Sequence, residues 1–344
     1  MNSRNDWVDY AKAIGIVLVV YGHVIRGLIT ANILEKTPFQ ALVDSIIYSF
    51  HMPLFFFLSG LFFIQTMNRR GAGGTWLSKV DTVFYPFVLW SMLQGSIEVF
   101  LSHYTNGDLA MGQVFKLLWQ PRAQFWFLYA LFLIFTVAVL MYRSRAMYLP
   151  ILGLWAAVYC IQPYLPNFGV GDFLIQNFVF FALGVCFSAY PQPFHRKPAV
   201  WSFGLFVLFV ASQYVFHITL GRNYIDRDVF SLVVAVIGIG LVVTLSMAAA
   251  TYPVRWVLSI GMMSMHIYLM HILAGSGVRV IMSKFMGIQD PTAHIVAGTL
   301  AGIVLPIVAA RILLTMNMRF LFEIPTRFSA LRRLSSHQPR SAAT

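Results

Sequence analysis

The sequence predicts an all-α integral membrane protein with about ten transmembrane helices and both termini in the cytoplasm. Its composition is the first observation behind this prediction. The chain has 344 residues, of which 59% are hydrophobic and only 10% are charged, and its mean hydropathy is +0.74. Because ordinary soluble domains carry about 25% charged residues, lipid is the expected solvent for most of this chain.

The second observation is a series of ten apolar runs of about 17–25 residues, the length that crosses the hydrocarbon core of a bilayer. In chain order they are Ala11–Ile29, Val43–Ile64, Val83–Leu101, Phe125–Met141, Met147–Tyr164, Phe173–Ala189, Ala199–His217, Phe230–Ala249, Trp256–Gly275 and Thr292–Thr315. The fifth run is the weakest, because it ends in the polar, proline-rich stretch Tyr159–Pro166. No signal-peptide pattern precedes the first run, so we expect it to remain as a helix.

The runs are joined by short segments, and two of these, Asn68–Gly74 and Tyr190–Pro198, are rich in glycine or proline. We therefore expect one multi-pass domain over residues 1–320. A basic cytoplasmic tail, residues 321–344, is expected to rest on anionic lipid head groups.

The third observation is the distribution of lysine and arginine, which favours cytoplasmic loops in membrane proteins. With the N-terminus inside, fourteen fall in the inner segments: Arg4, Arg69, Arg70, Lys79, Arg143, Arg145, Arg196, Lys197, Arg255, Arg319, Arg327, Arg332, Arg333 and Arg340. Eight fall in the outer loops: Arg26, Lys36, Lys116, Arg122, Arg222, Arg227, Arg279 and Lys284. This bias accounts for the net charge of +12, so we expect no nucleic-acid partner.

The first run carries the most informative polar pattern. Lys12 and His23 are about three helical turns apart, so they share a face and lie about 16 Å from each other. Asp9 and Arg26 extend the same stripe. An ionisable side chain at mid-bilayer costs about 2.5–3.5 kcal/mol on insertion scales, which makes each of these groups a functional candidate. Lys12 is also compatible with snorkelling to the inner surface, whereas His23 lies too deep for that.

The second run, entered from outside, reads "FHMPLFFFLSGLFF" and places His51 at about the depth of His23. Pro53 removes the backbone hydrogen bond to the carbonyl of Ser49 and is expected to kink the helix. The pair Ser59-Gly60 fits either a small-residue packing contact or a catalytic serine.

In the ninth run, His266 and His271 are five positions apart and therefore lie on different faces. Glu98 is placed near the outer end of the third run, and Arg122 at the outer mouth of the fourth. The ionisable candidates that gather in the outer half of the membrane are His23, His51, His271, Arg26, Arg122 and Glu98.

Three histidines at one depth allow several kinds of site. A zinc site is disfavoured, because no HExxH spacing and no further acidic or thiolate ligand accompanies them, and we expect no metal. An acid–base site and a proton pathway both remain open. Cys160 and Cys186 lie in apolar runs and are interpreted as packing residues.

Four segments resemble the signature segments of the acyltransferase-3 family of bacterial integral-membrane acyltransferases. They read "DYAKAIGIVLVVYGH", "FHMPLFFFLSGLFF", "FWFLYALF" and "IGMMSMHIYLMH". The resemblance covers the first nine predicted helices and is closest to the fucose 4-O-acetylase-like branch and to acetylases of exported polysaccharides.

The resemblance implies transfer of an acetyl or other short acyl group from cytoplasmic acyl-CoA to a sugar hydroxyl. The implied acceptor is a cell-surface or exported polysaccharide or a glycolipid, and the implied location is the bacterial inner membrane. Acetyl-CoA would be the donor substrate, and membrane lipid and polysaccharide synthesis or export machinery would be partners. Some members carry an additional esterase-like domain, for which this chain is expected to have no room.

The family pairs a basic residue with a histidine ten intervening residues later, which corresponds here to Lys12 and His23. Many members have arginine at the first position, and lysine lacks its bidentate fork. We expect His23 to act as general base, with Arg26, Arg122 or His51 stabilising the oxyanion. Direct acetylation of His23 is the alternative route. The cations expected to bind the phosphates of CoA are Arg69, Arg70, Lys79, Arg143 and Arg145.

Two other classes of protein compete with this interpretation. A secondary transporter or flippase for a sugar or lipid-linked glycan would explain intramembrane His, Lys and Glu without bond breaking. Transporters often have interrupted helices in matching positions of two halves, and Pro53 has no such match in the second half. A structural subunit of an export machine would not need Lys12 and His23 on one face.

Overall fold

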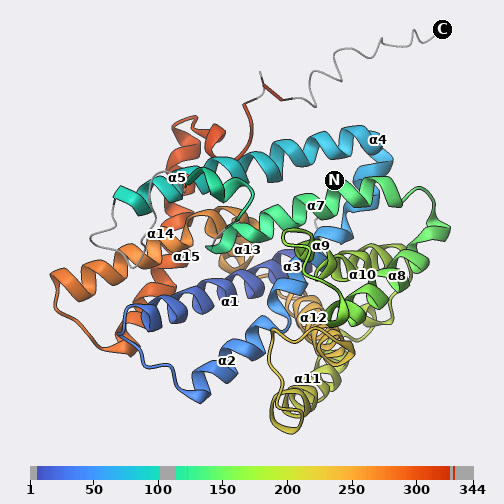
Figure 1. Ribbon diagram of the computed structural model, residues 1–344, viewed down its shortest axis with the longest axis horizontal. Coiled ribbons are helices and arrows are strands. Elements are labelled where there is room, and N and C mark those ends of the chain that lie inside the picture. Colours follow the sequence, from blue (N-terminus) through green and yellow to red (C-terminus); the bar gives the residue numbers. More distant parts are fainter. Residues whose placement is uncertain (1–5, 101–113, 122, 326–327, 330–344) are drawn as a thin grey trace.

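The computed structural model describes residues 6–100, 114–121, 123–325 and 328–329, and it contains helices but no strands over these residues (Figure 1). The helices are α1 Asp6–Thr30, α2 Pro38–Tyr48, α3 His51–Leu61, α4 Phe63–Lys79, α5 Tyr85–Phe100, α7 Trp126–Met141, α8 Tyr148–Ile161, α9 Gly171–Ile175, α10 Phe178–Ala189, α11 Pro198–Tyr214, α12 Val229–Ala249, α13 Arg255–Met262, α14 Ser264–Val280 and α15 Pro291–Thr315. Three short π-helical segments, Val80–Phe84, Val215–Thr219 and Ile281–Phe285, follow α4, α11 and α14.

Ten helical stretches in the described part of the chain are long and apolar enough to cross a membrane. Each coincides with one of the ten predicted runs, so the all-α, multi-pass fold class is confirmed. The cytoplasmic location of both termini stays a prediction. Most of the predicted tail, residues 321–344, lies outside the described residues.

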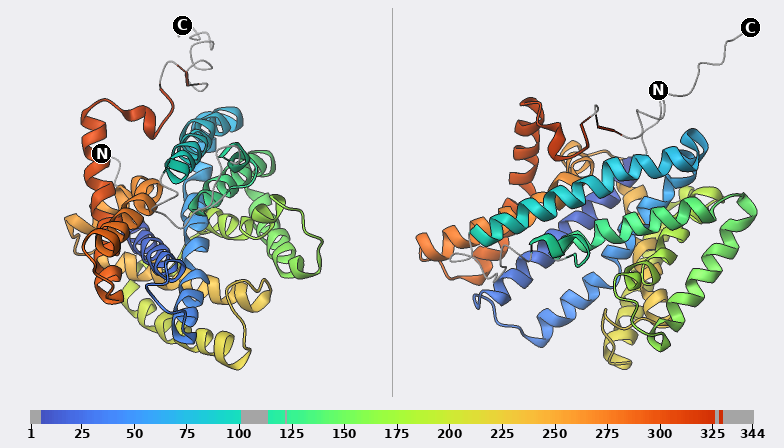
Figure 2. Two further views of the ribbon diagram at one scale, coloured as in Figure 1. Left: turned by 60° about the vertical axis from the view of Figure 1, so that its left-hand side comes forward. Right: turned by 45° about the horizontal axis from the view of Figure 1, so that its top comes forward.

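Helix α1 is the hub of the bundle. It packs against α3 and, from the other half of the chain, against α12, α13, α14 and α15 (Figure 2). Asp6 and Asp9 lie in its first turn, where their negative charges interact favourably with the positive end of the helix dipole. Gly261 allows α13 to approach the backbone of α1 closely, since a Cβ at this position would overlap the backbone of Asp9. The polar stripe of α1 is thereby enclosed by helices from both halves of the sequence.

The second span differs from the prediction at Pro53. The helix does not kink there but breaks earlier, at Phe50, whose dihedral angles are φ −135° and ψ −26°. Helix α3 then begins at His51, which puts Pro53 in its first turn, where a missing N–H breaks no helical hydrogen bond. Gln213 of α11 donates from Nε2 to Oγ of Ser49 at 3.0 Å and satisfies a polar group at this break.

The third span begins earlier than predicted. The glycine-rich stretch Asn68–Gly74 was expected to be a linker, yet it is helical on both sides of a single break at Gly71. Gly71 has φ +67°, a left-handed conformation that glycine adopts without strain. The ribbon turns sharply within α4 in Figure 1 and continues through Val80–Phe84 into α5. The reversal between the second and third spans therefore takes place at one residue.

The ninth span also differs from the predicted Trp256–Gly275. The chain breaks at Met263, with φ −93° and ψ 8°, so that Arg255–Met262 forms the separate helix α13. The membrane-spanning stretch is Ser264–Phe285. The short helix α13 is held by α1, against which Gly261 lies. The continuous apolar run Trp256–Gly275 therefore gives no sign of the break at Met263.

The pair Ser59-Gly60 forms a packing contact. Ser59 donates from Oγ to the carbonyl of Phe55 at 2.8 Å, within its own helix. A Cβ on Gly60 would overlap the backbone of Phe181, and one on Gly184 would overlap the backbone of Phe57. Helices α3 and α10 therefore touch backbone to backbone, as small residues permit inside membranes.

This contact predicts a strong steric effect at Gly60. Gly60→Leu should lower the melting temperature of the detergent-solubilised protein by roughly 5 °C or more, because backbone cannot move aside as a side chain can. Gly204→Leu is the matched control, since Gly204 lies on a spanning helix with nothing within 4 Å of its Cβ position. Equal melting temperatures for the two variants would contradict the close α3–α10 approach.

Candidate functional site

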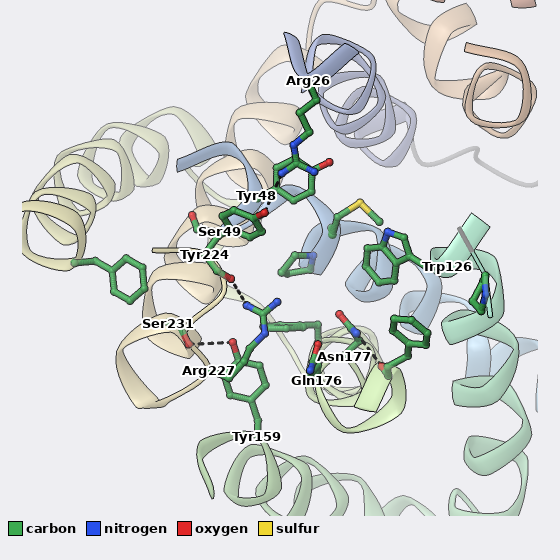
Figure 3. Close-up of a pocket in the computed structure, with 16 residues that line it drawn as sticks. Arg26, Tyr48, Ser49, Trp126, Tyr159, Gln176, Asn177, Tyr224, Arg227 and Ser231 are labelled. Atoms are coloured by element: carbon green, nitrogen blue, oxygen red, sulfur yellow. Dashed lines mark hydrogen bonds between the residues drawn. The ribbon is translucent and has the colours of Figure 1, made fainter. Parts of the chain in front are cut away.

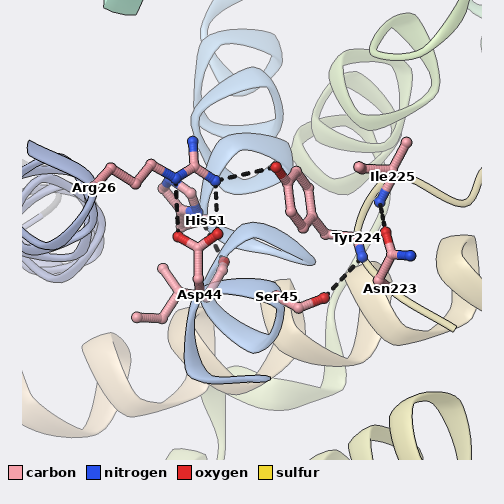
Figure 4. A network of polar contacts seen from close by, with 8 residues as sticks. Arg26, Asp44, Ser45, His51, Asn223, Tyr224 and Ile225 are labelled. Atoms are coloured by element: carbon pink, nitrogen blue, oxygen red, sulfur yellow. Dashed lines mark hydrogen bonds and ion pairs between the residues drawn. The ribbon is translucent and has the colours of Figure 1, made fainter. Parts of the chain in front are cut away.

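Arg26, near the end of α1, is the centre of a polar cluster (Figure 4). It donates from Nε to Oδ1 of Asp44 at 3.0 Å and from Nη2 to Oδ2 at 2.8 Å, a bidentate ion pair with α2. Nη2 also reaches the hydroxyl of Tyr224 at 3.3 Å. The guanidinium lies 3.6 Å from the ring centroid of Tyr48. Arg26 thus joins α1, α2 and the segment before α12.

His51, the first residue of α3, lies directly beside this cluster. Its Nδ1 is 2.7 Å from the carbonyl oxygen of Ile47. Because a carbonyl only accepts, the hydrogen is on Nδ1, and Nε2 of the neutral ring is the acceptor. The ring meets Tyr48 edge to face, with centroids 4.4 Å apart. His51 therefore supports the aromatic ring on which Arg26 rests.

His23 and His271 form a second group of candidate functional side chains. Their ring centroids are 5.1 Å apart. Nδ1 of His271 lies 3.1 Å from the carbonyl oxygen of Ile267 and 2.8 Å from that of Tyr268, which puts its hydrogen there as well. Nε2 of His271 is buried and has no hydrogen-bond partner in the described part of the chain. The ring beside His23 therefore carries a buried nitrogen that can still accept a hydrogen bond.

These two histidines line a cavity of about 210 Å³ between α1, α14 and α15, which we call the small cavity. Arg26, Arg279 and His294 also line it. Arg279 donates from Nη1 to the carbonyl of Gly27 at 2.5 Å, which fixes its side chain against α1. The small cavity therefore combines imidazoles with two guanidinium groups.

A second cavity, of about 340 Å³, which we call the large cavity, is also lined by Arg26 (Figure 3). Its aromatic and polar lining comes from α2, α7, α8, α9, α10 and α12 and from the segments between helices. These residues include Tyr48, Trp126, Tyr159, Gln176, Asn177, Tyr224, Arg227 and Ser231. Arg26 is therefore a lining residue of both cavities.

Lys12 lies on the same uninterrupted helix as His23 but lines neither cavity. Its Nζ is 3.6 Å from Oδ1 of Asp9, an ion pair in which the lysine side chain is 34% exposed. Asp9 itself is buried against α13. The predicted stripe thus separates into an ion pair at one end of α1 and the cavity-lining His23 and Arg26 at the other.

One predicted residue, Glu98, is not brought into this cluster. Glu98 is half-buried near the end of α5 and lines neither cavity. Arg122 lies outside the described residues. Its neighbours Pro121 and Trp126 do line the large cavity.

The predicted CoA-binding cations fall in two groups. Arg69 and Arg70 precede the turn at Gly71, and Arg70 donates from Nη1 to Oγ of Ser78 at 2.5 Å. Arg143 lines a third cavity, of about 410 Å³, together with Asn68 and Gly71.

The side chain of Lys79 contacts an aromatic ring, and that of Arg145 contacts a backbone carbonyl and a second aromatic ring. Nζ of Lys79 lies 4.2 Å from the ring centroid of Phe135. Arg145 donates from Nη2 to the carbonyl of Ala189 at 2.7 Å and lies over the ring of Tyr190. Arg145 is therefore directed toward α10 by these contacts.

Sequence reasoning missed several residues of the cluster. Asp44 could have been predicted from the sequence, because it is an acidic residue within an apolar run and such a group usually has a charged partner. Tyr224 and Arg227 belong to a loop that only the fold brings beside α1 and α2. Among the described residues, no group of three or more His, Cys, Asp or Glu side chains is placed to hold a metal ion.

The fold and the cluster define a multi-pass membrane protein with a histidine- and arginine-lined site between its helices. The model of the acyltransferase-3 family, described as an acyltransferase domain, matches residues 5–311, and the chain belongs to this family.

One curated relative is nodulation protein NolL of Sinorhizobium fredii (strain NBRC 101917 / NGR234), which is 27% identical over 190 residues. The alignment covers 54% of this chain and 50% of that protein, so the match spans about half of each. No solved structure matches the chain.

The Arg26–Asp44 pair predicts a measurable coupling energy. In a double-mutant cycle of Arg26→Gln and Asp44→Asn, measured by reversible unfolding in mixed micelles, the coupling should be about 1–3 kcal/mol. Pairing Arg26→Gln with Asp6→Asn is the control, since Asp6 is twenty positions away on the same helix, or about 30 Å. Additive effects for Arg26 and Asp44 would contradict the bidentate contact.

Proposed function

We propose that the protein moves an acetyl, or another short acyl, group from cytoplasmic acyl-CoA to a sugar hydroxyl. The proposed acceptor is a cell-surface or exported polysaccharide or a glycolipid. The observation that carries the proposal is His23, which corresponds to the family's basic-residue-to-histidine motif and faces a cavity beside His271 and Arg26. Family membership supports acyl transfer over transport, which needs no such motif.

In the proposed reaction, His23 accepts the proton of the sugar hydroxyl while the hydroxyl oxygen attacks the carbonyl carbon of the thioester. The C–O bond forms, the C–S bond breaks, and the proton passes from His23 to the sulfur of the departing CoA. Formation of an acyl-His23 intermediate, followed by attack of the hydroxyl, is the alternative route. Both routes give the same products.

The oxyanion that forms on the thioester carbonyl requires a donor. Arg26 supports this role, because it lines the small cavity and its Nη1 is not used in the contacts with Asp44 and Tyr224. A fixed guanidinium costs little reorganisation when charge develops. We assign His51 a positioning role, since it contacts Tyr48 and lines neither cavity.

For the donor, we propose that the phosphates of CoA bind around the turn at Gly71. Arg143 and Asn68 line the cavity there, and Arg69 and Arg70 directly precede Gly71. Phosphate oxygens form strong charge-assisted hydrogen bonds with such cations. Lys79, on the same helix, adds charge nearby, and Arg145 adds charge at the adjacent helix end.

This proposal places the protein in the bacterial inner membrane, with its helices in contact with lipid. The donor would be reached from the cytoplasm and the acceptor from the opposite side. Polysaccharide synthesis or export machinery would supply that acceptor.

The central test is His23→Ala. It should leave a membrane-inserted, folded protein, because removing a polar group lowers the cost of insertion. Since a positioned general base contributes about 10²–10⁴ in rate, transfer of label from radiolabelled acetyl-CoA to glycan should fall at least a hundredfold. Lys12→Arg should retain much of the activity and Lys12→Ala should not. Retention of more than about a tenth of wild-type turnover by His23→Ala would remove His23 from the base role.

A further prediction concerns His271, whose ring lies beside that of His23 and whose Nε2 has no partner in the described part of the chain. We propose that during the reaction this Nε2 accepts a hydrogen bond from His23 and so holds the His23 ring. His271→Phe keeps the ring shape but removes the acceptor, and should lower kcat about tenfold or more with KM for the donor unchanged. His271→Gln, whose side-chain oxygen can accept, should recover much of kcat. Equal loss in both variants would indicate packing and not positioning.

A further inference from the structure

The large cavity contains a cation that the proposed chemistry does not use. Arg227 lies in the segment before α12, and its guanidinium extends into the cavity between Tyr224, Gln176 and Asn177 (Figure 3). Nη1 donates to the carbonyl of Tyr224 at 2.5 Å. This contact leaves the other nitrogens of the fork available, because a carbonyl oxygen engages only one of them.

The acidic residues around Arg227 have other partners. Asp226 accepts from the backbone N–H of Asn223 at 2.8 Å. Asp228 forms an ion pair with Arg222 and caps α12 by accepting from the N–H of Ser231 at 2.9 Å. Arg227 consequently has no carboxylate partner in the described part of the chain.

The other cation of the cavity is already neutralised. Arg26 forms its bidentate pair with Asp44, so the two charges cancel. The described residues that line the cavity include no aspartate and no glutamate. The cavity therefore carries the uncompensated positive charge of Arg227, which is half-buried in the loop before α12.

The rest of the lining fits a sugar. Trp126 and Tyr48 present aromatic rings, and Gln176 and Asn177 present amides. Pockets of this kind bury apolar faces and orient a ligand with a few polar groups. The loop that carries Arg227 is preformed, since Ser45 accepts from the N–H of Tyr224 at 2.8 Å, which limits the entropy lost on binding.

We propose that the large cavity binds the acceptor and that Arg227 binds an oxyanion of that acceptor. The oxyanion is the carboxylate of an acidic sugar or the phosphate of a lipid-linked glycan, both of which match the planar guanidinium. The inference rests on the proposed acyl transfer, because it assigns the acceptor subsite of that reaction. A sugar held at Arg227 would extend past Arg26, which lines both cavities, to present a hydroxyl to His23.

The test is a binding measurement that needs no turnover. Protein in lipid nanodiscs is titrated calorimetrically with glucuronate, glucose 1-phosphate and glucose. Wild-type protein should bind at least one of the anionic sugars about tenfold or more tightly than glucose, as expected for a charge-assisted hydrogen bond. Preference for glucuronate alone identifies an acidic sugar, and preference for glucose 1-phosphate alone identifies a phosphorylated acceptor.

Arg227→Gln should abolish this preference, and Lys36→Gln is the matched control, since Lys36 is an exposed cation in the loop between α1 and α2. The control should bind as wild type does. Equal binding of glucose and both anionic sugars, or a preference that survives Arg227→Gln, would overturn the inference. If the preference is present but no label moves from acetyl-CoA to any glycan, the proposed function fails while the anion subsite stands.

Discussion

The bidentate contact between Arg26 and Asp44 is the interaction on which the rest of the site depends. It joins the end of α1 to α2, and Nη2 of the same arginine reaches Tyr224 in a loop nearly two hundred positions later. A guanidinium within a membrane bundle is tolerable only where it is paired and hydrogen-bonded. Because the guanidinium fork is rigid, the bidentate contact with Asp44 also fixes the plane of the group, and Arg26 lines both cavities.

Helix geometry selects the tautomers of the buried histidines. His51 and His271 both direct Nδ1 to a carbonyl three or four positions earlier, which is within reach because helical side chains point toward the N-terminus. The neutral rings therefore expose Nε2, the nitrogen able to accept a proton or a hydrogen bond. Backbone carbonyls thus fix the tautomer of these histidines. No carboxylate, which would be expensive to bury, is needed to orient them.

The sequence alone predicts the spans well and their interruptions poorly. Long apolar runs indicate helices that lipid stabilises, but they do not mark where the breaks at Phe50 and Met263 fall. Within the site, His23, Arg26 and His271 were predictable, because an ionisable group in an apolar helix is costly and therefore informative. Loop residues such as Tyr224 and Arg227 carry no such signal, since only the fold places them beside α1.

In the proposed acyl transfer, the two cavities have different roles. The small one, about 210 Å³, holds the imidazoles and is suited to the reacting atoms, whereas the large one, about 340 Å³, has the aromatic and amide surface suited to recognition. Binding of the acceptor in a cavity away from the reacting atoms increases the rate only if that binding positions the reacting hydroxyl. Arg26 lines both, so in the proposed reaction one side chain would couple the position of the acceptor to stabilisation of the oxyanion.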